Sequence, residues 1–144
     1  MQQRTLAEIA AEPWVTRPLE PILERHRGAI DAVRRAAREA DGVVVVDLVD
    51  AGVEGANKFI AYHLFPAAAY AVVVTHDAKR TKVSVGSNPW ARPNHAHDIS
   101  KLCERYGGGG HPVVGAVSLP PDRLEEARRV AAEIAATLRT PPAP

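Results

Sequence analysis

The spacing of apolar residues predicts a long amphipathic helix near the start of the chain. From Leu19 onward, apolar positions recur with the 3.6-residue period, and arginines and acidic residues occupy the opposite face. This pattern predicts a helix over about Glu20–Ala40, preceded by a short helical turn that begins near Leu6. Because proline interrupts a helix, Pro13 and Pro18 predict a break between the two.

Short β-branched runs predict a sheet in the rest of the chain. The predicted strands are Val43–Val49, Ala68–Thr75, Thr81–Val85 and Val113–Ser118, and the predicted helices are Ala56–Leu64, Ile99–Tyr106 and a C-terminal helix that ends near Leu138. This order predicts an α/β (α+β) fold, a small sandwich whose mixed sheet of about four to five strands is flanked by helices. We expect residues 42–139 to form this domain, residues 1–41 to be a helical extension, and residues 140–144 to be a disordered tail.

Composition narrows the class of protein. The 144 residues are 46% apolar and 24% charged, so a globular core is feasible. A net charge of +1 argues against a non-specific nucleic-acid coat, and a single cysteine argues against a disulfide framework or a multi-cysteine zinc module. No apolar run approaches the roughly 20 residues that span a bilayer. We therefore expect a soluble, cytoplasmic protein that does not act at a membrane.

Four consecutive glycines, Gly107, Gly108, Gly109 and Gly110, precede His111 and Pro112. Such a run is entropically unfavourable in a folded domain, so a specific use is expected. Glycine permits close approach of a ligand and lets several backbone N–H groups converge on an anion. His111 would then donate a hydrogen bond to a phosphate oxygen. The alternative is a flexible connection in which Gly107 ends the preceding helix.

This segment also resembles a known family. The string Asp-Ile-Ser-x-Leu from Asp98, the Tyr-Gly-Gly-Gly-Gly-His-Pro string from Tyr106, and Gly115 resemble the C-terminal substrate-binding (DHH-associated) domain of the DHH phosphoesterase superfamily. The resemblance covers about Val43 to Leu138. It implies that the glycine loop and His111 hold the terminal phosphate or nucleotide of a substrate. The adjacent-strand residues that it implies are Ser84 and Ser87.

Two departures from the family pattern limit what the resemblance implies. Gly86 stands where the family often has an arginine, in a Ser-x-Arg-Ser stretch. The Asp-His-His triplet of the catalytic domain does not occur in this sequence. Manganese or magnesium is therefore expected only in a separate catalytic domain, and no catalytic residue and no cofactor are assigned to this chain.

Other polar residues leave alternatives open. Asn88 and Trp90, in a Ser-Asn-Pro-Trp turn, either contact a base or sugar or anchor a packed loop. A metal set made of His95, His97, Cys103 and His111 is conceivable. Because Cys103 falls on the apolar stripe of its helix, we interpret it as a buried thiol and assign no metal site.

Three hypotheses about function follow. In the first, the chain is a binding module for a nucleotide, a short single-stranded nucleic acid or another phosphate ligand. In the second, it is a subunit or fragment of a metal-dependent phosphoesterase, such as an oligoribonuclease, a nucleotide phosphatase or an exopolyphosphatase-like enzyme. In the third, it is a structural oligomerisation domain. The long apolar stripe of the first helix also predicts a homodimer through that helix.

Overall fold

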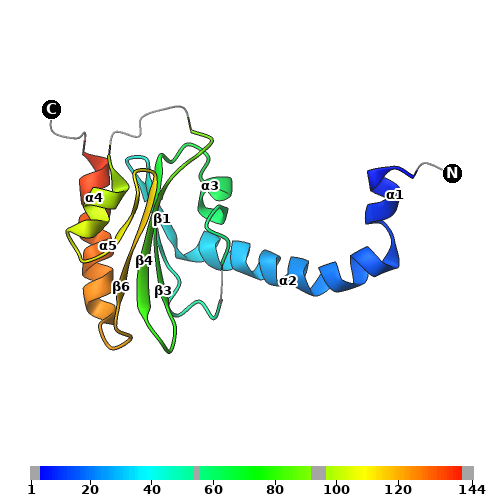
Figure 1. Ribbon diagram of the computed structural model, residues 1–144, viewed down its shortest axis with the longest axis horizontal. Coiled ribbons are helices and arrows are strands. Elements are labelled where there is room, and N and C mark those ends of the chain that lie inside the picture. The colour runs from blue at the N-terminus through cyan, green and yellow to red at the C-terminus, as the bar shows by residue number, and fades with distance from the viewer. Residues whose placement is uncertain (1–3, 54–55, 92–96, 141–144) are drawn as a thin grey trace.

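A single six-stranded sheet lies between two layers of helices (Figure 1). The computed structural model describes residues 4–53, 56–91 and 97–140. The strands are β1 Ala37–Ala40, β2 Val43–Asp47, β3 Tyr70–His76, β4 Thr81–Ser87, β5 Gly109–His111 and β6 Val114–Leu119. The helices are α1 Leu6–Ala10, α2 Pro13–Ala36, α3 Ile60–Leu64, α4 Ile99–Glu104 and α5 Leu124–Arg139. None of these helices is long and apolar enough to cross a membrane.

The sheet has the order β1-β2-β3-β4-β6-β5. Strands β2 and β3 are parallel, with α3 in the connection between them, and the other neighbours are antiparallel. The predicted mixed sandwich is therefore confirmed. It gains two short edge strands, β1 and β5, that the sequence pattern did not indicate.

Each face of the sheet buries its own apolar cluster. On one face, Ile99 and Cys103 of α4 and Ile134 of α5 pack against Val83 and Val85 of β4. The opposite face packs against Ala29 and Val33 of α2 and against α3. Strand β2 reads as a continuous valine run because its alternate side chains enter these two clusters.

Residues 37–40 belong to the sheet and not to the predicted N-terminal extension. They were expected to continue the first helix, but they form β1, which pairs with β2 through a hairpin at Asp41 and Gly42. Both hairpin residues have positive φ, at 51° and 76°, as a tight turn requires. Alanine, arginine and glutamate favour helix, so the pairing with β2 overrides the local preference.

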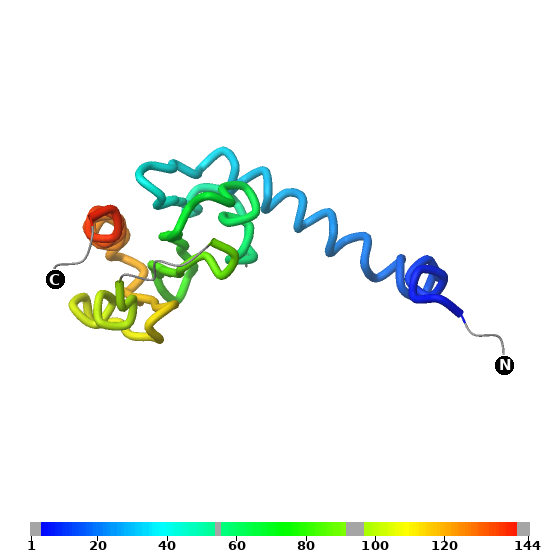
Figure 2. Tube along the Cα trace, turned by 90° about the horizontal axis from the view of Figure 1, so that it is seen from above, coloured from blue at the N-terminus to red at the C-terminus, as the bar shows by residue number. Residues whose placement is uncertain are grey.

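Helix α2 is also longer at its start than predicted. It begins at Pro13 and continues through Pro18 and Pro21, so the expected break is wrong. The first of these prolines stands where a helix begins, a position that needs no N–H donor. Figures 1 and 2 show the N-terminal half of α2 extending away from the sheet and carrying α1 at its far end.

Three of the four consecutive glycines are required by the chain's own packing. Gly107 has φ +74° just after α4. A Cβ on Gly108 would lie 2.2 Å from the carbonyl oxygen of Ala116, and one on Gly110 would lie 2.3 Å from that of Val114. Gly109 has nothing within 4 Å of its Cβ position. The glycine run therefore lets β5 approach β6, and Gly109 alone is free of this constraint.

Helix α3 contacts the sheet through Tyr62, which is buried. Its hydroxyl lies 2.8 Å from the position that a Cβ on Gly86 would occupy. Glycine at this position thus makes room for the phenol. Burial raises the pKa of Tyr62 well above its usual range, opposed in part by a hydrogen bond with the Ala71 backbone.

The glycine packing predicts opposite effects at two neighbouring positions. Gly108→Ala should lower the free energy of unfolding by about 1–3 kcal/mol, because the new methyl group overlaps the β6 backbone. Gly109→Ala should leave it unchanged or raise it by up to about 1 kcal/mol, because the methyl group meets no neighbour. Urea unfolding of both variants measures this, and equal losses would contradict the assigned packing.

The buried phenol predicts a specific loss of stability at alkaline pH. The folded-state pKa of Tyr62 is raised, so the folded state keeps a proton that the unfolded state releases above about pH 10. Its contribution is fully present below that pH and is lost as the pH rises. Unfolding of wild type and Tyr62→Phe at about pH 8 and pH 11 should show a smaller alkaline loss in the variant. The same loss in both proteins would show that Tyr62 does not carry it.

Candidate ligand site on the sheet

An open cavity of about 400 Å³ lies between the sheet and α3. Its floor is the face of β3, β4 and β6 that α3 leaves partly uncovered, and its walls come from α3, from the loop after β4 and from the β5–β6 turn. The residues that line it are Lys58, Phe59, Tyr62, Ala71, Val73, Ser84, Val85, Gly86, Ser87, Pro89, Val113 and Val114.

Strand register places the glycine loop on the same face as this floor. Ser84 lines the cavity and is opposite Ala116, which in turn is opposite Gly109. Gly86 is opposite Val114, and Val114 is opposite His111. Directly opposed residues of paired strands project to the same face of a sheet. His111 and the open space at Gly109 therefore lie on the cavity's side of the sheet, just beyond its edge.

Two aromatic rings and an ammonium group lie on the opposite side, where Lys58 and Phe59 line the first cavity and Trp90 lines a neighbouring one. Phe59 and Trp90 contact edge to face, with ring centroids 5.4 Å apart, and Trp90 is 68% exposed. The Nζ atom of Lys58 lies 5.1 Å from the centroid of the Phe59 ring. Such a wall presents π faces and positive charge to solvent, which suits a base or sugar attached to a phosphate.

A second cavity of about 370 Å³ adjoins the first. Phe59 and Tyr62 line both cavities. The second one continues past Trp90 to His63 and to His26 of α2. The two cavities thus lie next to each other, with Phe59 and Tyr62 as shared lining residues, and the second one reaches the base of α2.

Of the predicted site residues, both serines lie at the first cavity. Ser84 is on the floor and Ser87 is at the rim. The Ser87 Oγ atom donates to the carbonyl oxygen of Val113 at 3.1 Å and joins the loop after β4 to the β5–β6 turn.

Asn88 anchors a loop. Its side chain is 1% exposed, and its Nδ2 atom donates to the carbonyl oxygens of Pro66 at 3.2 Å and of Ala68 at 2.9 Å. Its Oδ1 atom accepts from the backbone N–H of Trp90 at 3.0 Å. These bonds occupy the amide, so a ligand contact of Asn88 is not available in this conformation, and the packed-loop alternative describes it.

Two of the four glycine amides form hydrogen bonds within the chain. The N–H of Gly107 donates to the carbonyl oxygen of Glu104, and that of Gly108 to the carbonyl oxygen of Cys103, each at 3.0 Å. These bonds end α4. Within this loop, we therefore expect a ligand to contact the segment from Gly109 to His111.

Two of the candidate metal ligands, His97 and Cys103, have structural contacts of their own. His97 bonds through Nε2 to the carbonyl oxygen of Thr140 at 2.8 Å, whereas Cys103 is buried beneath Gly115, and burial raises the pKa of its thiol. His95 lies outside the described residues. Within residues 4–53, 56–91 and 97–140, no three His, Cys, Asp or Glu side chains are grouped to hold an ion. The described donor set therefore does not fit manganese or magnesium.

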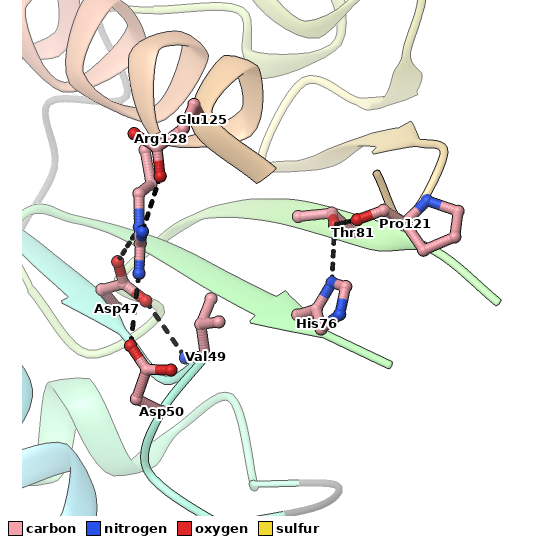
Figure 3. Close-up of polar contacts among 8 residues, drawn as sticks. All are labelled: Asp47, Val49, Asp50, His76, Thr81, Pro121, Glu125 and Arg128. Carbon is pink, nitrogen blue, oxygen red and sulfur yellow. Dashed lines mark hydrogen bonds and ion pairs between the residues drawn. The ribbon is translucent and has the colours of Figure 1, made fainter. Parts of the chain in front are cut away.

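Acidic residues at the end of β2 take part in ion pairs (Figure 3). Arg128 of α5 binds Asp47 at 2.8 Å, Glu125 at 2.8 Å and Asp50 at 3.4 Å. Because these carboxylates raise the pKa of Arg128, the guanidinium stays charged. The Arg128 side chain thus joins α5 to the residues at the end of β2.

His76 likewise has a structural contact in Figure 3, where its Nδ1 atom lies 2.9 Å from Oγ1 of the buried Thr81. The neighbouring Asp77 accepts hydrogen bonds from the backbone N–H groups of Lys79 and Arg80. The two adjacent side chains therefore have separate partners and do not act as a pair.

The pattern of the sequence indicated Trp90 as a residue that could contact a base or sugar, but it did not indicate Phe59. The apolar spacing over Ala56–Leu64 predicts a helix with Phe59 on its inward face. Helix α3 begins one residue after it, so Phe59 is 39% exposed and turns toward Trp90. A sequence signal for the two exposed rings is that each aromatic residue follows an asparagine by two positions. In both cases the asparagine Oδ1 atom accepts a hydrogen bond from the backbone N–H of the aromatic residue.

Comparison with known proteins finds likeness at the level of structure. No family model matches the sequence, and no curated protein matches it. The pGpG-specific phosphodiesterase PggH of Vibrio cholerae matches 93% of this chain with a TM-score of 0.78 and 20% identity. An exopolyphosphatase-related protein of Bacteroides fragilis matches 81% with a TM-score of 0.61 and 14% identity. The DHH domain of a member of the S1p family of ribosomal proteins matches 90% with a TM-score of 0.57 and 13% identity.

These likenesses concern part of each protein. The chain spans 47% of the phosphodiesterase, 35% of the exopolyphosphatase-related protein and 34% of the DHH-domain structure. At such low identity they show a shared fold and do not transfer an activity. The chain therefore shares the fold of one part of each of these three proteins.

Proposed function

We propose that the chain is a substrate-binding domain of the DHH phosphoesterase type, which holds a phosphate or nucleotide end beside His111. The observation that carries the proposal is the register that brings Ser84, Gly109 and His111 to the side of the sheet with the open cavity. The resemblance in sequence and the likeness in fold point to the same kind of protein independently.

The phosphate is held at the edge of the sheet. His111 is exposed, so its ring can donate a hydrogen bond to a phosphate oxygen. The space above Gly109 lets that phosphate approach the backbone. Lys58, on the far wall, supplies the positive charge that the floor of the cavity lacks.

The group attached to the phosphate occupies the cavity. Val73 and Val114 make the floor apolar, and the ring of Phe59 offers a face on which a base can stack. Trp90, in edge-to-face contact with Phe59, lines the adjoining cavity. A small inorganic phosphate would bind only at the sheet edge beside His111. A nucleotide would bind there through its phosphate and would place its base or sugar in the cavity. The proposed ligand is therefore a nucleotide or the end of a short single-stranded nucleic acid.

Catalysis is proposed to reside in another part of a larger assembly. The proteins of similar fold are about two to three times as long as this chain. A site that binds substrate and transition state equally accelerates a reaction little. This chain would thus position the phosphate for metal-bound catalytic groups supplied elsewhere.

Removal of the imidazole tests the site. His111→Ala should weaken binding of mono- and dinucleotides by about 1–3 kcal/mol, the value of a lost charge-assisted hydrogen bond. Gly109→Val should abolish binding, because its side chain would fill the space next to the phosphate. His76→Ala, at the opposite end of β3, is the control. Titration calorimetry, with circular dichroism to verify folding, measures all three. Unchanged affinity in His111→Ala would refute the assignment.

A second prediction concerns turnover. The purified chain with manganese or magnesium should hydrolyse labelled dinucleotides, mononucleotides carrying a second phosphate, and polyphosphate no faster than buffer does. Hydrolysis by two metal ions needs several carboxylates that converge on ions about 3.5–4 Å apart. Release of labelled product is the readout. Turnover that a chelator abolishes would make the chain an enzyme in its own right.

A further inference from the structure

The N-terminal arm, defined as α1 with residues 13–28 of α2, makes little contact with the sheet. The buried residues of α2 all lie beyond the arm, at Ala29, Ala32 and Val33, and α1 has none. Nine large apolar side chains are exposed among the described residues, and the arm holds five of them: Leu6 85%, Trp14 68%, Leu19 40%, Ile22 51% and Leu23 38%. The arm thus presents an uncovered apolar face.

Local preference does not favour a helix here. Pro18 and Pro21 lie inside α2, and each removes a backbone donor and strains the preceding turn. Gly28 weakens the helix where the arm joins the body. Most helical stability in proteins comes from packing of an apolar face. A helix with this sequence needs a partner along its exposed side.

The exposed face continues the face that is buried at the other end of the helix. Val15, Leu19, Ile22 and His26 follow one another at alternating spacings of four and three residues, and Ala29 and Val33 extend the series. This is the repeat by which two helices pack side by side. The last two positions are buried against the sheet and α3, whereas Leu19, Ile22 and His26 are exposed and Val15 is partly exposed.

We propose that a second copy of this chain covers the arm, with the two α2 helices antiparallel about a twofold axis. Leu19 of each copy then lies opposite Ile22 of the other, and Val15 lies opposite His26. In this register each contact between two residues is made twice, once by each copy, as two antiparallel copies of one helix require. A twofold dimer requires such reciprocal contacts.

The same arrangement accounts for exposed residues on the body. His26 lines the second cavity together with His63 and Trp90, at the base of the arm. In the antiparallel register, Val15 of one copy reaches His26 of the other, which brings the adjacent Trp14 and α1 to that cavity. The exposed ring of Trp90 would then be covered as well.

The area that a stable interface requires favours a dimer in which each arm packs against both the arm and the body of the other copy. The free part of α2 is about 24 Å long, and two such helices alone bury less than the roughly 1,200 Å² of a stable interface. Trp14, Leu6 and the cavity of the other copy supply the remainder. The competing occupant is a further part of a longer chain, since the proteins of similar fold are longer.

Sedimentation of the full chain tests the proposal. Wild type should be a dimer over a hundredfold range of concentration. Ile22→Glu, which places a charge in the contact, should raise the dissociation constant by at least about tenfold. Arg17→Glu, on the opposite face of α2, is the matched control and should remain a dimer. A monomeric wild type, or an unchanged dimer in Ile22→Glu, would overturn the proposal.

Cross-linking tests the register separately from stability. Val15→Cys and His26→Cys should be joined by a short bismaleimide only when the two variants are mixed. In the antiparallel register, the two copies of position 15 lie about 16 Å apart, beyond such a linker. Wild type measures the background from the buried Cys103. Cross-linking within either variant alone, or none in the mixture, would overturn the antiparallel pairing.

Discussion

The close approach of β5 to β6 is the constraint on which the candidate site depends. At Gly108 and Gly110 the backbone leaves no room for a Cβ atom, because the carbonyl groups of β6 already occupy that space. Helix α4 reinforces the arrangement from the other face, where a Cβ on Gly115 would lie 2.8 Å from Cys103 Sγ. Because β5 pairs this closely with β6, the side chains of β5 alternate between the two faces of the sheet in a fixed register. This register places His111 on the cavity side of the sheet. A looser connection would leave the imidazole without a fixed direction.

The two faces of the sheet have different roles for a physical reason. The face beneath α4 and α5 is filled by valine, isoleucine and leucine side chains and is a closed core. Helix α3 is only five residues long, so it covers a small part of the other face. The uncovered part is floored by Ser84, Gly86 and Val114, which are too small to fill the space above them. The cavity is thus the consequence of a short helix over small residues.

Helix α2 shows how one amphipathic stripe can act in two environments. Its last turns pack on the sheet, whereas the preceding turns carry the same apolar pattern into solvent. Pro18 and Pro21 weaken the helix in this exposed part, because each removes a backbone N–H donor. The arm and the ligand site meet at Phe59, Trp90 and His26, so a partner along the arm would also border the proposed nucleotide.

The amino-acid sequence by itself determined the class of fold and the main strands and helices, and it indicated the segment around His111 as a candidate site. These follow from apolar periodicity and from a glycine run that few folds tolerate. The edge strand over residues 37–40 did not follow, because its residues prefer helix and only pairing with β2 makes them a strand. The tertiary structure also separated Gly109 from its three constrained neighbours and assigned Asn88 to a buried loop anchor. It also placed the partly exposed ring of Phe59 in edge-to-face contact with Trp90. Each of these outcomes depends on which backbone or ring lies nearby, and contacts between segments far apart in the chain leave no periodic trace in the sequence.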